Sequence, residues 1–329
     1  MLLRWSVSPV RRVLLCLALL LMLPGAAWAA GKVIYYITPG LDLPFWRTLG
    51  LGVKTGAAQR GFQYQVLDSQ NSEAKQTEHI QAAIRAQASG IVLSPIDSLS
   101  AQRMLALTSK ARIPVVIADI GTNGGEYVSY VKSDNYRGAY NVGQAVAAAL
   151  KARNVSNPEF ALCTIELTRK NGQDRTNGFV DAMKEAGFTN QVALRQMKSY
   201  TIEETEQFVE DILKAHPGLS ALFVEVDKPT LGALKVLSRS GKLKQVVVGS
   251  YDGIPEFVDQ LKQGNLVAVG MQQPYLMGTQ SAAALLDAIQ GKPAAKQILV
   301  PVLNATSMNV NEWLPVAKRT VFGAEKAAP

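Results

Sequence analysis

The stretch 32–46 reads KVIYYITPGLDLPFW, and the rest of the chain is organised around it. Its first seven residues form an apolar run of β-branched and aromatic side chains, which is typical of a buried strand. A loop with Pro39 and Gly40 follows, and a helical pattern occupies residues 49–60. This order predicts the opening strand–loop–helix unit of a parallel sheet. Ligands of such sheets lie outside the carboxyl ends of the strands, so we expect a ligand beside this loop.

Phe45 and Trp46 stand at the end of that loop. They are candidates for an aromatic wall on which a ligand stacks. Both rings could equally do no more than pack the loop onto the rest of the fold, because aromatic side chains bury well in many positions. The spacing alone does not choose between these roles.

The N-terminus has the three parts of a secretory signal peptide. Three arginines precede the unbroken apolar run 13–23, and residues 27–29 (AWA) fit a cleavage site with small residues. The apolar run is too short to span a bilayer as a permanent helix. We therefore expect residues 1–29 to be a cleaved signal peptide and the mature chain to start at Ala30.

Charge and cysteine content narrow the class of protein. The chain has 34 Lys and Arg against 26 Asp and Glu, and its formal net charge of +8 falls to +5 when the three arginines of the leader are removed. The remaining charges are spread, which argues against nucleic-acid binding. Cys16 leaves with the leader, so Cys163 stays alone and no internal disulfide is expected. The exported chain must therefore be stabilised by its core.

Short apolar runs alternate with helical patterns from residue 32 onward, and the alternation occurs twice. All-apolar strands that alternate with helices indicate a parallel sheet covered on both faces, and the repetition predicts two similar lobes. The first series has strands at 32–38, 63–67, 91–93, 114–118 and 127–131, with helices at 49–60, 73–88 and 101–111. The second has strands at 160–165, 192–197, 222–226, 246–250 and 266–271, with helices at 173–186, 202–215, 230–239 and 255–263.

One acidic position repeats with the lobes. Residues 113–119 read IPVVIAD and residues 245–252 read QVVVGSYD, so a strand in each half ends in an aspartate. If both lobes present their strand ends to a shared cleft, Asp119 and Asp252 face the same ligand from opposite sides. Alternatively, each aspartate only caps the helix or turn after its strand. The sequence leaves both roles open.

A series of short motifs, in this order and spacing, resembles one family. They are PFW at 44–46, LDSQN at 67–71, SPIDS at 94–98, IPV at 113–115 before Asp119, SDN at 133–135, DRTNGF at 174–179, LGAL at 231–234, VG at 248–249, YDG at 251–253 and Gln272. Together they resemble the ribose-type periplasmic sugar-binding proteins of bacterial ABC importers, which share their fold with the cores of LacI-type repressors. The resemblance covers nearly the whole mature chain.

The resemblance implies an α/β fold of two doubly wound parallel-sheet lobes joined by three crossovers, the type I periplasmic binding protein architecture. It implies a first lobe of residues 30–135 plus 273–304 and a second lobe of residues 136–272 plus 305–329. A sugar or polyol would bind between the lobes in the periplasm, and an ABC permease would recognise their closure. We expect a monomer without cofactor, metal or nucleic acid.

The resemblance also implies which residues hold the ligand. Asp119, Asp252 and Gln272 would bind hydroxyl groups, and Phe45 and Trp46 would form an apolar wall. The second lobe would contribute Gln173, Arg175 and Asp227.

The chain departs from the family where Leu43, Ile120, Gln173 and Val226 replace polar residues. The pocket should therefore be less polar than a ribose site. Either the ligand offers fewer hydroxyl groups, or other residues supply the missing contacts. The candidates for that supply are Tyr35, Tyr36, Lys170, Tyr200, Glu225 and Lys228.

An enzyme is disfavoured because residues 38–42 lack a dinucleotide or phosphate-binding glycine pattern, residues 249–253 are no nucleophile elbow, and His79 and His216 lack ligand spacing to Cys163. A repressor would need a helix-turn-helix where the export signal stands. A ligand-sensing protein that docks on a chemoreceptor or sensor kinase ectodomain would have the same lobes, and the sequence does not separate it from a transport protein.

Overall fold

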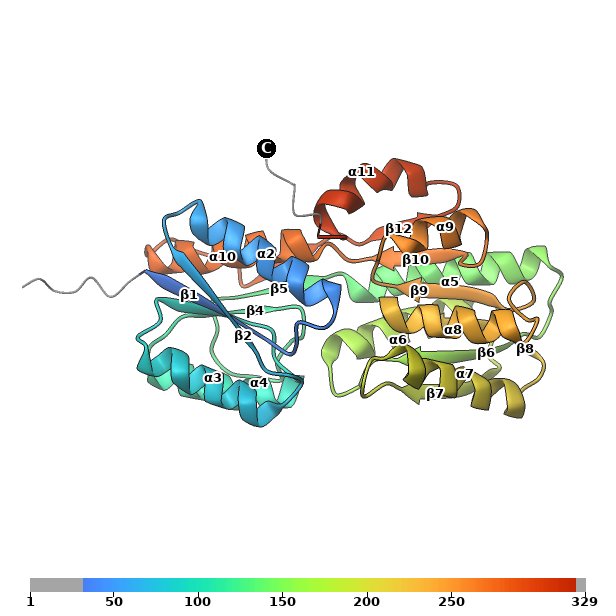
Figure 1. The fold of residues 1–329 in the computed structure, drawn as a ribbon, viewed down its shortest axis with the longest axis horizontal. Helices are drawn as coiled ribbons and strands as arrows, with labels where there is room; N and C mark the ends of the chain where they lie inside the picture. The colour runs from blue at the N-terminus through green and yellow to red at the C-terminus, as the bar shows by residue number, and fades with distance from the viewer. Residues whose placement is uncertain (1–31, 324–329) are drawn as a thin grey trace, which may run out of the picture. The chain divides into compact units, whose positions relative to one another are not determined.

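The computed structural model describes residues 32–323, so the predicted signal peptide lies outside the described part of the chain. Two six-stranded sheets form the framework of two lobes (Figure 1). This arrangement confirms the predicted α/β class with two doubly wound lobes. Every strand predicted from the sequence overlaps an observed strand.

The first sheet is entirely parallel, in the order β11-β5-β4-β3-β1-β2. Its strands are β1 (Val33–Thr38), β2 (Gln63–Asp68), β3 (Gly90–Leu93), β4 (Val115–Ala118), β5 (Ser129–Ser133) and β11 (Gln297–Val300). Helices cover both faces, as Figure 1 shows: α2 and α10 lie over one face, α3 and α4 over the other. Their bounds are α2 (Pro44–Ala58), α3 (Glu73–Arg85), α4 (Ser98–Lys110) and α10 (Pro274–Ile289).

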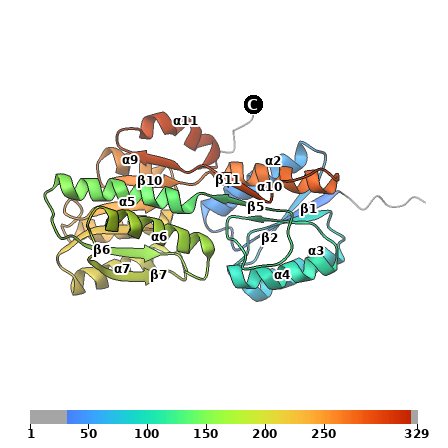
Figure 2. The same ribbon diagram turned by 180° about the vertical axis from the view of Figure 1, so that it is seen from behind.

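The second sheet has the order β12-β10-β9-β8-β6-β7, with β12 antiparallel to β10. Its strands are β6 (Glu159–Thr164), β7 (Gln191–Gln196), β8 (Leu219–Val224), β9 (Val247–Tyr251), β10 (Ala268–Met271) and β12 (Leu303–Thr306). Helices α5 and α6 cover one face, which Figure 2 shows from the front. The bounds of the helices are α5 (Asn135–Ala152), α6 (Lys170–Glu185), α7 (Ile202–Ala215), α8 (Asp227–Arg239), α9 (Glu256–Lys262) and α11 (Val310–Thr320).

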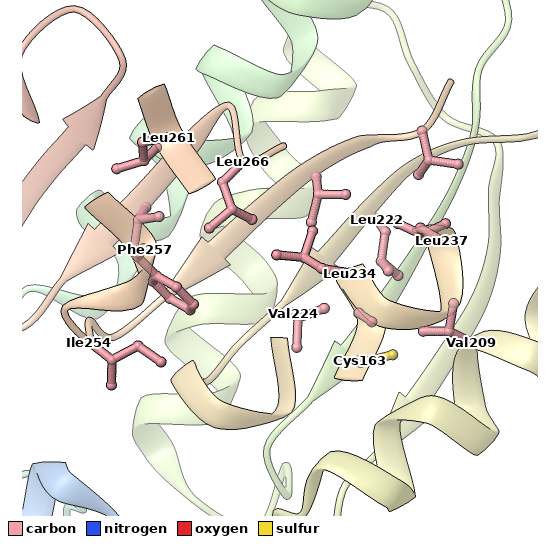
Figure 3. Packing of buried hydrophobic residues seen from close by; sticks show 14 of the residues in the cluster. Cys163, Val209, Leu222, Val224, Leu234, Leu237, Ile254, Phe257, Leu261 and Leu266 are labelled. Atoms are coloured by element: carbon pink, nitrogen blue, oxygen red, sulfur yellow. The ribbon is translucent and has the colours of Figure 1, made fainter. Parts of the chain in front are cut away.

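Side chains from both layers fill the space between each sheet and its helices. Figure 3 shows the cluster on the α8 and α9 side of the second sheet, where helix residues meet the buried strand β8. The labelled members include Leu222, Val224, Leu234, Leu237, Phe257 and Leu261. Cys163 belongs to this cluster and is fully buried. Burial of apolar surface is the main stabilising term for such a fold, so this chain holds its lobes together without a disulfide among the described residues.

The chain passes between the lobes three times. The first passage leads from β5 to α5, the second from β10 to α10, and the third lies at residues 301–302 between β11 and β12. Leu303 and Asn304 pair with β10 in the second sheet. The predicted first lobe ends at residue 304, whereas these two residues belong to the second sheet. Apolar residues continue on both sides of Pro301, so the sequence shows one run. The chain changes sheets at Pro301: β11 ends before it in the first sheet, and β12 begins after it in the second.

Some helices differ from their sequence-based assignment. α2 starts at Pro44, not at residue 49, because a proline with its fixed φ is favoured in the first helical turn. Phe45 and Trp46 therefore stand on a helix, not in a loop. α6 starts at Lys170 instead of residue 173, and the prediction did not include α5, α10 and α11 at all.

Two helix pairs pack with their backbones in contact. The Cβ that an alanine would add at Gly178 in α6 would collide with the carbonyl oxygen of Tyr136 in α5. Gly52 in α2 and Gly278 in α10 face each other in the same way in the first lobe. These glycines allow α5 and α6, and α2 and α10, to lie close side by side on their sheets. Within residues 32–323, none of the helices combines the length and apolar character needed to cross a bilayer.

Candidate functional site

Asp119 follows β4 and Asp252 follows β9, at the carboxyl ends of strands in the two lobes. Both adopt a left-handed backbone, with φ of 67° and 63°, which aspartate tolerates better than most residues. Each backbone N–H donates a 2.9 Å hydrogen bond to the neighbouring strand, Asp119 to Val131 and Asp252 to Gly270. The same local bend thus turns one aspartate of each lobe away from its sheet.

The two carboxylates bind side chains, not helix ends. Asp119 Oδ2 accepts a 2.8 Å hydrogen bond from Asn171 Nδ2, and Asp119 Oδ1 has no partner. Asp252 Oδ1 accepts a 2.6 Å hydrogen bond from Gln272 Nε2, and its Oδ2 lies 3.5 Å from Arg175 Nη1. Both carboxylates accept these hydrogen bonds from side-chain amides. The contacts therefore do not show the helix-capping role, which is one of the two roles that the sequence left open.

A small cavity lies between these groups, and both lobes line it. Six of the eight predicted site residues contribute to it: Phe45, Trp46, Asp119, Arg175, Asp252 and Gln272. The remaining lining residues are Leu43, Ile165, Arg169, Asn171, Tyr200 and Val226. The replaced positions Leu43 and Val226 do face the cavity, so its wall is less polar there, as the sequence suggested.

Phe45 and Trp46 serve two purposes in the first turn of α2. Their rings meet edge to face, with centroids 4.8 Å apart. Both side chains are buried in the core of the first lobe, and both also line the cavity. The same two rings therefore pack the first lobe and line the cavity, and their stacking against a ligand stays a prediction.

Arg175 is the positive charge at the centre of the site. Its Nε donates to Asn135 Oδ1 at 2.9 Å, and its Nη1 donates to the carbonyl oxygen of Glu225 at 2.8 Å. The guanidinium carbon lies 4.3 Å from the centre of the Tyr251 ring. These contacts fix the orientation of the guanidinium. Its other N–H groups therefore point in set directions, which favours binding of a ligand in one orientation.

Several carboxyl groups are buried around Arg175, and burial makes their charged forms costly. Burial raises the pKa of Asp119 to about 7, although the nearby Arg175 opposes this effect. Burial also raises the pKa of Asp252 and, together with the charge of Asp252, that of Asp227. Glu225 accepts hydrogen bonds from Thr176 and from the backbone of Ile165, yet burial raises its pKa to about 8.

Three buried polar atoms that border the cavity lack a partner among the described residues. Asp119 Oδ1 and Gln272 Oε1 are acceptors, and Arg169 Nε is a donor. An unpaired buried polar atom costs about 1–3 kcal/mol, so a molecule that offers both donors and acceptors would gain by satisfying them. Hydroxyl groups have both properties.

Residues 168–174 of the second lobe bridge to the first lobe. Besides the bond from Asn171 to Asp119, Arg169 Nη2 donates to Asn71 Oδ1 at 3.0 Å and the Lys170 N–H donates to Ser98 Oγ at 3.2 Å. These contacts hold the lobes together, and the cavity between them is about 30 Å³. That volume holds about one or two waters. A larger ligand must therefore displace Asn171 from Asp119 and separate the lobes.

Two of the predicted residues do not line this cavity. Gln173 is exposed, and its Nε2 donates to the carbonyl oxygen of Leu167 at 2.8 Å, so the structure does not bring it to the other residues. Asp227 is buried at the start of α8 and lines an adjoining small space together with Phe45, Asp252 and Gln272. It therefore neighbours the cavity without facing it.

The cavity lining also includes Ile165, Arg169 and Asn171, which the sequence does not predict as site residues. All three lie between the end of β6 and the first turn of α6. The sequence predicts that α6 starts at residue 173, whereas it starts at Lys170. With the observed start, Arg169 and Asn171 lie at the strand-to-helix junction after β6, where ligand contacts are expected. Tyr200 also lines the cavity, and the sequence predicts it only as a residue that could supply extra contacts. No group of three or more His, Cys, Asp or Glu in residues 32–323 is arranged to hold a metal ion.

The chain is similar in sequence to periplasmic binding proteins over most of its length. A model of the periplasmic binding protein domain matches residues 34–293. The ribose import binding protein RbsB of Bacillus subtilis is 28% identical over 263 residues, covering 80% of this chain and 83% of the relative. RbsB of Escherichia coli K12 is also 28% identical over 263 residues, covering 80% of this chain and 86% of the relative.

Solved structures share the fold. A carbohydrate transporter solute-binding protein from Agrobacterium radiobacter, in complex with D-arabinose, superposes with a TM-score of 0.82 at 18% identity, covering 89% of this chain and 99% of that one. A solute-binding protein from Bacillus halodurans with bound myo-inositol superposes with a TM-score of 0.78 at 24% identity, covering 86% of this chain and 98% of that one. At these identities the likeness concerns the fold.

Proposed function

This chain belongs to the periplasmic binding protein domain family, and on that premise we propose that it captures a sugar or polyol between its lobes and delivers it to an ABC permease in the inner membrane. One observation carries the proposal. Each lobe turns one buried aspartate, Asp119 or Asp252, toward a single cavity that also has an aromatic wall. The relatives named above are ribose import binding proteins, which favours import over sensing.

The chemistry of the cavity suits hydroxyl groups. A hydroxyl in water is already hydrogen-bonded, so a protein gains affinity only if it surrounds the ligand with fixed partners. Asp119 and Asp252 would accept hydrogen bonds, whereas Gln272 and Arg175 would add an amide and a cationic donor. Phe45 and Trp46 would cover the C–H face of a ring. Asp227 would act from behind Asp252, through its charge.

Capture then follows from the contacts between the lobes. A hydroxyl that enters would replace the Asn171 amide on Asp119 while other groups of the same ligand bind Asp252 and Gln272. The ligand thus gains contacts with both lobes only when they close around it, and it shifts the population toward a closed form in which the ligand, in place of the Asn171 amide, bridges Asp119 and the second lobe. That closed form is what the permease would recognise.

We infer that residues 1–29 direct export to the periplasm and are cleaved, and that the mature chain acts as a monomer. Binding would occur without chemical conversion of the ligand, without a cofactor and without nucleic acid. The family and the curated relatives are binding proteins, which supports this assignment.

The direct test is ligand screening of the mature chain, residues 30–329. A compound that binds only the folded state raises the melting temperature by mass action, so a panel of sugars and polyols is screened by thermal shift and the hits are titrated by calorimetry. At least one sugar or polyol should bind. A panel in which none binds would reject the proposal.

A matched pair of variants then locates the site. Asp252→Ala should weaken binding of the hit by about 1–3 kcal/mol, or roughly 5- to 150-fold, because it leaves ligand hydroxyls unpaired. Asp211→Ala serves as the control because Asp211 is exposed on α7. Equal affinity in the wild type and both variants would remove Asp252 from the site.

A further inference from the structure

A second, larger chamber of about 480 Å³ lies beside the inner cavity. From the first lobe it is lined by residues of the β1–α2 loop and by Gln70 and Asn71. From the second lobe it is lined by residues 198–203 and Lys228. Leu43, Trp46, Arg169 and Tyr200 line both the chamber and the inner cavity, so the two spaces adjoin across these four side chains.

The chamber is present while the lobes are in contact. Arg169 lines the chamber and donates a hydrogen bond to Asn71 of the first lobe. The next two residues of the chain, Lys170 and Asn171, also donate hydrogen bonds to the first lobe. With the lobes in these contacts, the inner cavity measures about 30 Å³ and the outer chamber about 480 Å³, so the inner cavity must widen to admit a first ring, whereas the outer chamber already has room for a second.

Both walls of the chamber are held in place by local hydrogen bonds. In the second lobe, the Glu204 carboxylate accepts bonds of 2.8–2.9 Å from the backbone N–H groups of residues 198–200. In the first lobe, Asp68 Oδ1 accepts from the Gln70 N–H at 2.8 Å, and the Asn71 N–H donates to the Pro39 carbonyl oxygen at 2.6 Å. A wall that is ordered before binding loses little entropy when a ligand arrives.

The lining suits an uncharged, polyhydroxylated group. Trp46 and Tyr200 present aromatic surface, and the Arg169 guanidinium lies 5.1 Å from the centre of the Tyr200 ring. Arg169 is buried, and its Nε has no partner among the described residues. The other charged groups are of both signs, Asp42 and Glu203 against Lys198 and Lys228, so they select no net charge.

We propose that the outer chamber is a second subsite and that the ligand is a disaccharide or a glycoside, whose second ring lies against Trp46 and Tyr200 and accepts a hydrogen bond from Arg169 Nε. This inference rests on the proposed sugar-binding function. It also accounts for the less polar inner wall at Leu43 and Val226, because a ligand with a second ring obtains part of its polar contacts outside the inner cavity.

The test compares matched sugars on the mature chain. Pentoses and hexoses are titrated by calorimetry beside the disaccharides that contain them, such as D-xylose with xylobiose, D-glucose with maltose and D-galactose with melibiose. We expect one disaccharide to bind at least 10-fold more tightly than its own monosaccharide.

Three variants show where the preference arises. Ser199→Trp fills the chamber from its exposed second-lobe wall and should lower the disaccharide affinity at least 10-fold without changing the monosaccharide affinity. Ser199→Ala removes only the hydroxyl and should keep the preference. Ser156→Trp, on the exposed loop between α5 and β6, controls for the added indole and should change neither affinity.

The failures of the two proposals are distinguishable. A disaccharide that binds no more tightly than its monosaccharide, or a Ser199→Trp variant that weakens both equally, overturns the second subsite and leaves the sugar-binding function standing. If no sugar of either size binds the wild-type chain, the proposed function fails and this inference fails with it.

Discussion

Replacing Asp119 by asparagine should stabilise the protein at pH 8 while it weakens sugar binding. Burial raises the pKa of this carboxyl from 3.8 to about 7, so the folded state holds its proton more tightly than the unfolded state does. Stability that depends on this proton is present below pH 4 and is lost as the pH rises through 7. Asparagine has the same shape, carries no charge and tolerates the left-handed backbone at this position.

The magnitude follows from the two pKa values. They differ by about three, and each pKa unit corresponds to about 1.4 kcal/mol, so the full cost is on the order of 4 kcal/mol. About 2–3 kcal/mol of that cost develops between pH 5 and pH 8. For a chain of about 300 residues, such a difference corresponds to roughly 3–5 °C in melting temperature.

The assay is thermal and urea unfolding of wild type and Asp119→Asn at pH 5 and pH 8. The free energy of unfolding of the variant should exceed that of the wild type by about 2–3 kcal/mol more at pH 8 than at pH 5. The same variant should bind the sugar more weakly, because one acceptor of the site has become an amide. If the difference between the two proteins is the same at both pH values, the buried carboxyl does not carry the cost assigned to it.

Three further predictions concern other parts of the molecule. Arg175→Met should abolish measurable sugar binding because it removes the buried cation at the centre of the site. Gln173→Ala should leave the affinity measured by calorimetry unchanged because that side chain is exposed outside the cavity. Equal losses of affinity in the two variants would contradict this assignment of the site. Gly178→Ala should destabilise the chain by about 1–3 kcal/mol in urea unfolding because α5 is in backbone contact there, while Gly218→Ala, whose nearest neighbour is the end of a glutamate side chain, should cost less. Burial raises the pKa of Cys163 to about 12, so a thiol reagent should label the mature chain at pH 8 only after unfolding, and rapid labelling of the native protein would refute this burial.

Much of the fold could be predicted because the strands are short, apolar and rich in β-branched residues. α5 and α10 could not be predicted in the same way. The buried face of α5 includes the small residues Gly138, Ala139 and Gly143, so its apolar stripe is weak, and α10 is apolar over most of its surface and shows no clear alternation. Both helices depend on tertiary packing more than on their own pattern.

The site could be predicted only in part. Asp119 and Asp252 are recognisable because the same strand–aspartate pattern occurs in both halves of the chain. Asn171 and Arg169 gave no such signal, since they precede the apolar pattern of α6 and act by reaching across to the other lobe. The prediction that Gln173 lines the site is not met by the structure. Successive residues of a helix are turned by about 100°, so Gln173 faces solvent on α6 while Arg175, two residues later, faces inward.

A crystal structure of the mature chain grown with the sugar found by screening tests the central claim most directly. The account predicts a sugar ring between the two sheets, with hydroxyl groups within hydrogen-bond distance of both Asp119 and Asp252 and one face against Phe45 or Trp46. A sugar that touches only one lobe, or that binds away from the ends of β4 and β9, would contradict it.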